Sequence, residues 1–211
     1  MLTTLLVGLL LAPDERVSDY YPLVPGSKWT YEEVTKIGRD KFTRIYTDRV
    51  GEAVEINDQK AIPIFSKGPD GSESAIYHMV TESAVWVVAF DPAKPLPNPY
   101  PILQVSGSRE RWVFEGMTQF MHDFVPMKLE GNSYSGGTKT VLGDKLSTMW
   151  AETKAVIQAA ETGTTAMFAS SESKALYAKG IGLVEMTSKE TIGKTKSERT
   201  RKIVSYSSGV R

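Results

Sequence analysis

Histidine and methionine side chains form the most distinctive cluster of chemically active groups in this 211-residue chain. His122 lies in the segment Gly116–Met127, which also contains three methionines. Imidazole and thioether groups are ligands that copper accepts, whereas methionine and phenylalanine at this spacing commonly fill a core. His78, the other histidine, lies in an alternating apolar run, which favours a packed histidine over a general base. We therefore predict no metal site and no catalytic histidine.

Three segments resemble catalytic or nucleotide-binding motifs without completing them. Gly131–Ser135 lacks the closing glycine of Gly-x-Ser-x-Gly. Ser188–Thr195 resembles a phosphate-binding loop, but serine replaces its first glycine. Gly180–Glu185 begins like a dinucleotide fingerprint, but it ends in glutamate and opens an extended run, so we interpret it as a turn. The sequence thus predicts no catalytic residue and no cofactor.

Carboxylates are the remaining groups that could carry out catalysis. A glycosidase-type hydrolase needs two carboxylates that face each other across a cleft. The chain offers several on expected strands, which otherwise belong to solvated faces: Glu32, Glu33, Asp48, Glu110, Glu115 and Glu152. A hydrolase that uses paired carboxylates is therefore the alternative hypothesis.

Composition excludes several function classes. The 25 basic and 25 acidic residues balance, which gives no indication of a nucleic-acid partner. The absence of cysteine excludes disulfides, thiolate catalysis and cysteine-ligated metal sites in this chain. A hydrophobic content of 41% is typical of a folded globular protein.

An apolar stretch, Leu2–Ala12, opens the chain. It is too short for a membrane span, and its length fits the apolar centre of a secretory signal peptide. The alternative is a buried terminal strand or helix. We predict an exported protein with no transmembrane span, with a signal-like segment at residues 1–18 and a single β domain at 19–211.

Apolar residues recur with the two-residue period of strands over most of this domain. Trp29, Tyr31 and Glu33 share one face of an expected strand, and Val85–Phe90 is a continuous apolar run typical of a strand covered on both faces. Turn residues separate such runs, with about one strand for every 8–12 residues. We predict an all-β fold with an antiparallel curved sheet (a half-barrel, open barrel or sandwich) and at most minor helix.

The second half of the domain contains less regular segments. Residues 91–101 hold five prolines and are expected to form a stiff connector, and residues 131–137 are expected to form a loop. Residues 146–160 fit helix and strand spacing equally well; a strand is favoured because residues 161–163 could turn it into a partner at 164–169. Residues 183–189 and 197–206 predict a final hairpin.

Aromatic residues supply the candidate binding surface. On a curved sheet they could line an apolar cavity for a lipid-like ligand, or they could simply form an aromatic core. The candidate lining residues are Trp29, Tyr31, Trp86, Trp112, Phe114 and Trp150.

Two segments carry a family resemblance. Tyr21–Tyr31 reads Tyr-Pro-Leu-Val-Pro-Gly-Ser-Lys-Trp-Thr-Tyr, and Tyr177–Glu185 reads Tyr-Ala-Lys-Gly-Ile-Gly-Leu-Val-Glu. This layout resembles uncharacterised bacterial secreted or lipoprotein-like β proteins. The resemblance implies a curved, half-barrel-like antiparallel sheet and a location in the cell envelope, and it implies no catalytic residues.

These observations lead to one functional expectation. The chain is expected to be a non-catalytic protein of the periplasm or cell surface. Its expected partner is a hydrophobic small molecule in the concave sheet or another envelope protein. A hydrolase and a purely structural surface protein are the alternatives, and the sequence leaves the oligomeric state open.

Overall fold

The computed structural model describes residues 16–105, 109–120, 123–158 and 168–209, and it confirms the predicted all-β fold. Within these residues, one short helix, α1 (Val17–Tyr20), accompanies thirteen strands. The strands are β1 (Lys28–Ile37), β2 (Asp40–Val50), β3 (Val54–Ile56), β4 (Gln59–Lys67), β5 (Glu73–Val80), β6 (Ala84–Ala89), β7 (Pro95–Gln104), β8 (Arg109–Phe120), β9 (Asp123–Val141), β10 (Asp144–Gln158), β11 (Phe168–Ala178), β12 (Gly182–Ile192) and β13 (Thr195–Ser207).

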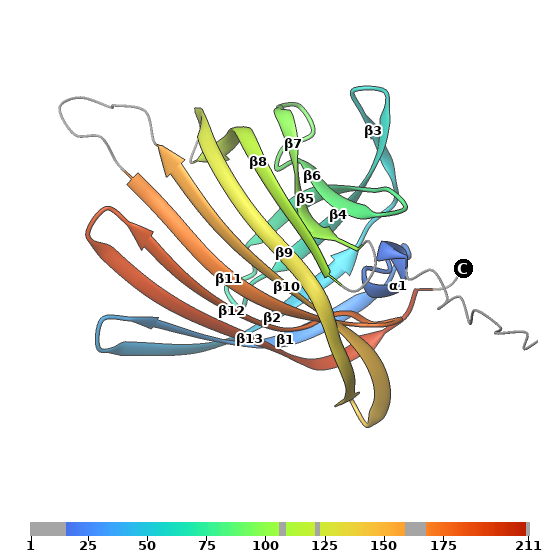
Figure 1. Cartoon of the computed structure of the whole chain (residues 1–211). Coiled ribbons are helices and arrows are strands. Elements are labelled where there is room, and N and C mark those ends of the chain that lie inside the picture. Colours follow the sequence, from blue (N-terminus) through green and yellow to red (C-terminus); the bar gives the residue numbers. More distant parts are fainter. Residues whose placement is uncertain (1–15, 106–108, 121–122, 159–167, 210–211) are drawn as a thin grey trace, which may run out of the picture.

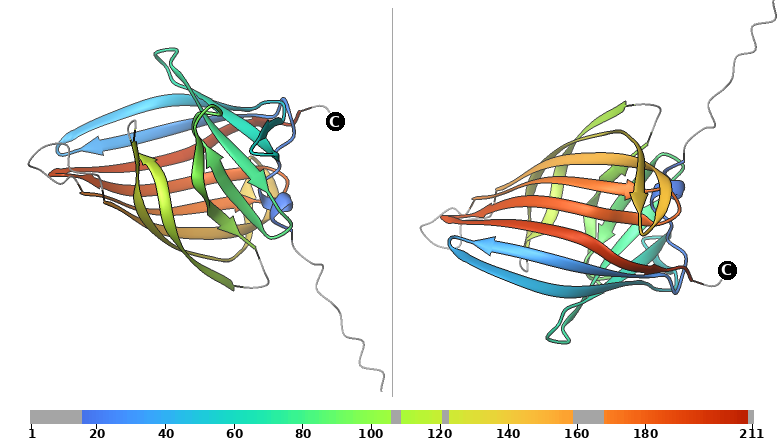
Figure 2. Two further views of the ribbon diagram at one scale, coloured as in Figure 1. Left: turned by 90° about the horizontal axis from the view of Figure 1, so that it is seen from above. Right: turned by 90° about the horizontal axis from the view of Figure 1, so that it is seen from below.

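All strand pairs in this sheet are antiparallel, and the sheet curves until it is nearly closed. The spatial order is β7-β6-β5-β4-β2-β1-β13-β12-β11-β10-β9-β8, with β3 paired to β4 outside this path. The last strand therefore pairs with the first, and one open seam remains between β7 and β8 (Figures 1 and 2). This closure encloses the concave face of the sheet.

Helix α1 lies at one end of the curved sheet, near the C-terminus (Figure 1). Val17 and Tyr20 are fully buried, in one hydrophobic cluster with Leu103 and Met149. Residue 19, the predicted start of the domain, lies within this helix. The apolar stretch at residues 2–12 lies outside the described residues.

The prediction of a loop at residues 131–137 is wrong, because these residues lie inside β9. Strand β9 pairs with β8 on one side and β10 on the other, so both neighbours hold its backbone extended. Gly131 is needed there because the indole of Trp112 occupies the place of a side chain. Gly137 has a φ of 69° next to a register shift, so it is part of a bulge in a continuous strand.

The proline-rich segment also differs from prediction. Pro95–Pro101 belong to β7 and do not form a connector outside the sheet. Strand β7 is at one end of the strand order, where residues without a backbone N–H are tolerated.

The two remaining predictions for the second half are confirmed. The ambiguous segment is a strand, β10, up to Gln158, and its partner is β11. The predicted turn at 161–163 lies outside the described residues. Strands β12 and β13 form the predicted final hairpin, with Ile192 opposite Thr195.

Candidate ligand-binding cavity

The concave face of the sheet encloses a cavity of about 800 Å³. Its wall is built from alternate residues of most strands, because every second side chain of a strand points inward. The segment after α1 adds Tyr21 and Leu23 to this wall. The apolar part of the lining, the apolar base, is defined by Leu23, Trp29, Tyr31, Ala175, Tyr177, Leu183 and Met186.

The polar tips of Trp29 and Tyr31 are bonded within the protein. The indole N–H of Trp29 donates to the carbonyl of Ile181 at 2.7 Å. The hydroxyl of Tyr31 donates to the carbonyl of Leu183 at 3.0 Å. Both bonds join β1 to the segment that opens β12, so the two sequence motifs at opposite ends of the domain meet here. These two aromatic rings can therefore offer apolar faces to the cavity while their polar tips are paired.

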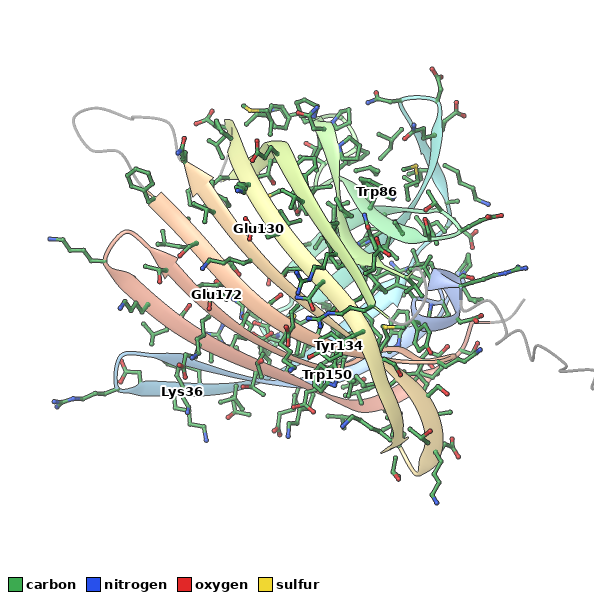
Figure 3. All side chains as sticks on the ribbon, in the orientation of Figure 1. Lys36, Trp86, Glu130, Tyr134, Trp150 and Glu172 are labelled. Atoms are coloured by element: carbon green, nitrogen blue, oxygen red, sulfur yellow. The ribbon has the colours of Figure 1, made fainter. Side chains whose placement is uncertain are left out.

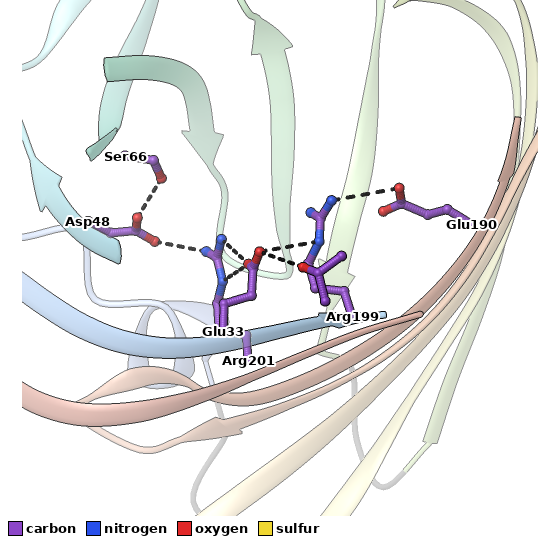
Figure 4. A network of polar contacts seen from close by, with 7 residues as sticks. Glu33, Asp48, Ser66, Glu190, Arg199 and Arg201 are labelled. Atoms are coloured by element: carbon purple, nitrogen blue, oxygen red, sulfur yellow. Dashed lines mark hydrogen bonds and ion pairs between the residues drawn. The ribbon is translucent and has the colours of Figure 1, made fainter. Parts of the chain in front are cut away.

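A charged network crosses the same concave face (Figure 4). The guanidinium of Arg201 lies 2.8 Å from a carboxylate oxygen of Glu33 and 3.4 Å from one of Asp48. Ser66 donates a further hydrogen bond to Asp48. Arg201 also lies over the rings of Tyr31 and Tyr46, 5.4 and 5.3 Å from their centroids. The arginine thus has charged partners on two strands and aromatic contacts.

These contacts decide how the two buried carboxylates behave. Burial raises the pKa of Asp48, and the hydrogen bond from Ser66 and the charge of Arg201 oppose that rise. Glu33 and Asp48 are two inward-facing carboxylates of the kind that the hydrolase hypothesis would pair. Both bind the same arginine, whose single positive charge they share.

His78 is a packed histidine, as predicted from its position in an alternating apolar run. Its side chain is buried, and its Nε2 lies 3.4 Å from the hydroxyl of Tyr21. Burial lowers the pKa of His78 to about 4, so the ring is neutral near pH 7. His122 lies outside the described residues.

The six predicted lining residues occupy different places. Trp29 and Tyr31 line the cavity. Trp112 does not line this cavity; it is 7% exposed, and its indole covers Gly131 of β9. Phe114 lies two residues further along β8, with its ring 5.9 Å from that of Tyr100.

The other two predicted residues, Trp86 and Trp150, face away from the cavity (Figure 3). Each is flanked by a residue that lines the cavity, Val87 and Ala151 respectively, so alternation places the tryptophan on the outer face. Trp86 packs against the cluster that contains Ile56 of β3. The ammonium of Lys174 lies 4.6 Å from the ring of Trp150.

Several lining residues were not predicted from the sequence, notably Tyr177, Met186, Arg199 and Arg201. The last two alternate along the predicted final hairpin, and this alternation was available as a signal. Their charge concealed them, because arginines on a strand ordinarily indicate a solvated face. Only the closure of the sheet turns that face inward.

Comparison with known proteins gives weak likenesses. The sequence matches no protein-family model and none of the curated proteins. Three solved structures align with 89% of this chain. A putative exported protein with a YmcC-like fold from Bacteroides fragilis is 12% identical, with 98% of that chain covered and a TM-score of 0.44.

The other two structures are no closer. A putative lipoprotein from Parabacteroides distasonis is 7% identical, with 98% of that chain covered and a TM-score of 0.44. A putative outer membrane lipoprotein-sorting protein domain from Vibrio parahaemolyticus is 11% identical, with 87% of that chain covered and a TM-score of 0.28. At these TM-scores the likenesses support no conclusion about the function of this chain. In the described part of the chain, no helix has the length and apolarity needed to cross a membrane.

Proposed function

We propose that this chain is a non-catalytic, exported binding protein that holds a hydrophobic small molecule in its concave sheet. The observation that carries the proposal is the cavity of about 800 Å³ with aromatic and aliphatic side chains at its base. Pockets for small organic ligands commonly measure about 300–1,000 Å³ and are mainly apolar. The cavity therefore has the size and lining of a ligand site.

The bonding of the polar groups supports a binding role over a catalytic one. The tips of Trp29 and Tyr31 donate to backbone carbonyls, and the carboxylates of Glu33 and Asp48 are bound by Arg201. A general acid or base needs a titratable group that is free to exchange a proton with a substrate. These groups are held by protein partners.

The proposed location is the bacterial periplasm or cell surface. It is supported by the stretch Leu2–Ala12, whose length fits the apolar centre of a signal peptide. In that compartment the protein would hold a lipid-like molecule or present it to an envelope protein.

A substitution that fills part of the cavity tests the binding role. Ala155 lines the cavity, whereas Val156, the next residue of β10, is 39% exposed. We expect Ala155→Phe to weaken binding of the hydrophobic dye N-phenyl-1-naphthylamine by about tenfold or more, because the added ring occupies ligand space. Val156→Phe is the matched control and should bind like the natural chain.

Fluorescence titration measures both affinities, and circular dichroism verifies that both variants keep the sheet. Equal dye affinity in the two variants would contradict binding in the cavity. Absence of dye binding by the natural chain would count against the proposal as well.

A further inference from the structure

A row of residues crosses the concave face, one per strand from β8 to β13, and all but one of them carry a polar group on the side chain. In each pair of neighbouring strands, the register places the two members of this row directly opposite each other. This polar row consists of Trp112, Gly131, Thr153, Ser173, Ser188 and Arg199. Three of them, Thr153, Ser173 and Arg199, line the cavity of about 800 Å³.

The polar row adjoins the apolar base. Thr153, Ser173 and Arg199 line the same cavity as the apolar base. The next inward-facing residues on β11 and β12, Ala175 and Met186, already belong to the apolar base. A strand advances about 3.3 Å per residue, so the change from polar to apolar wall takes about 7 Å.

Several hydrogen-bond donors of the polar row have no partner among the described residues. The indole Nε1 of Trp112 and the hydroxyl of Ser188 are buried without a hydrogen bond. Both side chains are more than nine-tenths buried, at 7% and 6% exposure. Buried polar groups are ordinarily hydrogen-bonded, and an exception indicates a missing ligand or water.

Arg199 is the charged member of the polar row, and its own contacts are long. Its Nε lies 3.5 Å from Glu33 and its Nη2 lies 3.8 Å from Glu190. Neither distance is that of a strong charge-assisted bond, and its Nε makes no hydrogen bond with a described residue. Arg201, by contrast, bonds the other oxygen of Glu33 at 2.8 and 3.0 Å. Arg199 therefore keeps donors available to a ligand.

We propose that the ligand is an amphiphile whose acidic oxygen head group, a carboxylate or a phosphate, is bound by Arg199 and Ser188 while its apolar chain fills the apolar base. This inference rests on the proposed function and specifies its ligand. An indole N–H and a guanidinium can only donate hydrogen bonds, and both the pair Thr153–Ser173 and Ser188 supply hydroxyls, so the row matches an acceptor-rich head. Arginine binds carboxylate and phosphate through paired N–H groups.

The carboxylate of Glu190 should weaken the binding of an acidic head group to Arg199, so its removal tests the proposal. Its carboxylate is the second partner of Arg199, so it competes with an acidic ligand for the guanidinium. Replacing it with glutamine should strengthen binding of an acidic amphiphile. Glu198, the outward-facing residue before Arg199, pairs with Lys189 and supplies the control.

The experiment compares three probes that share a sixteen-carbon chain: palmitate, monopalmitoyl phosphatidate and hexadecanol. Displacement of N-phenyl-1-naphthylamine gives each affinity, and inorganic phosphate alone shows whether a free anion suffices. The variants are Arg199→Gln and Ser188→Ala, with Lys202→Gln on the outer face of the same strand as control.

We expect at least one acidic probe to bind about tenfold or more tightly than hexadecanol, and Arg199→Gln to remove that preference. Ser188→Ala should reduce it about threefold, Glu190→Gln should increase it by a similar factor, and Lys202→Gln and Glu198→Gln should leave it unchanged. The better acidic probe assigns the head as carboxylate or phosphate.

Two results would overturn the proposal. Equal affinity for all three probes, with no change in Arg199→Gln, would show that the site binds no acidic head group and takes a purely apolar ligand. No binding of any probe would remove both this inference and the proposed function. Competition by inorganic phosphate alone, with no effect of the chain, would also contradict an amphiphile.

Discussion

At the scale of single residues, the unusual feature is a set of charges held inside a curved sheet. Glu33 and Asp48 are 4% and 8% exposed, and both contact the guanidinium of Arg201. An isolated buried charge costs several kcal/mol, whereas a paired and hydrogen-bonded charge is tolerated. Loss of the arginine should therefore destabilise the fold chiefly because it would leave two buried carboxylates without this partner.

Truncating this arginine tests that dependence. We expect Arg201→Ala to lower the free energy of unfolding by about 3–5 kcal/mol, because two buried carboxylates lose their common partner. Urea denaturation measures the change. Lys202→Ala, on the exposed face of β13, should cost less than about 0.5 kcal/mol. A similarly small loss for Arg201→Ala would mean that the network is solvated.

The buried histidine makes a prediction about pH. The pKa of His78 is about 4 in the folded chain and 6.5 in the unfolded one, so the unfolded chain binds the extra proton between these values. Its contribution to stability is therefore complete above pH 6.5 and is lost as the pH falls toward 4, by up to about 3 kcal/mol.

His78→Gln isolates this contribution, because Asp48 titrates with the opposite sign in both proteins. Burial raises the pKa of Asp48, so its protonation favours the folded chain as the pH falls. The measurement is the free energy of unfolding from pH 4 to 7. Stability should fall more steeply with acid in the natural chain than in the variant, and parallel curves would contradict a neutral buried ring.

At the scale of elements, β8 and β9 show how a local rule gives way to tertiary pairing. Residues 131–137 are rich in glycine and serine, which indicates a loop when they are taken alone. In the sheet, strands on both sides satisfy their backbone groups, and the indole of Trp112 covers Gly131. The glycine is required by a neighbouring strand.

Adding one methyl group at this glycine tests the contact. We expect Gly131→Ala to lower the free energy of unfolding by about 1–3 kcal/mol, because the new methyl overlaps the indole of Trp112. Thermal or urea unfolding gives the value. In a Trp112→Leu background the same substitution should cost clearly less, and an equal cost in both backgrounds would place the strain elsewhere.

The alternating strands were predictable from the sequence because each carries its own periodicity. Trp29 and Tyr31 were assigned to one inward face, and the final hairpin was located from its two runs. Trp86 and Trp150 were grouped with the lining residues because aromatic character does not reveal which face of a strand turns inward. That assignment depends on the direction in which the sheet closes, and no local pattern encodes it.

At the scale of the whole molecule, one curved sheet surrounds the cavity. Helix α1 lies at one end, β13 joins β1, and the open seam runs between β7 and β8 (Figure 2). The concave face is apolar near α1 and polar along the row that ends at Arg199. Such a wall suits a molecule with two chemically distinct ends, which connects the fold to the proposed ligand.

The central claim is that this cavity holds a hydrophobic ligand, and native mass spectrometry tests it most directly. The protein is purified from a bacterial envelope without detergent and measured before and after organic extraction. We predict an initial mass above that of the polypeptide, with the excess lost on extraction and recovered as a lipid-like molecule. An identical, unliganded mass before and after extraction would contradict the claim and favour a structural or protein-binding role.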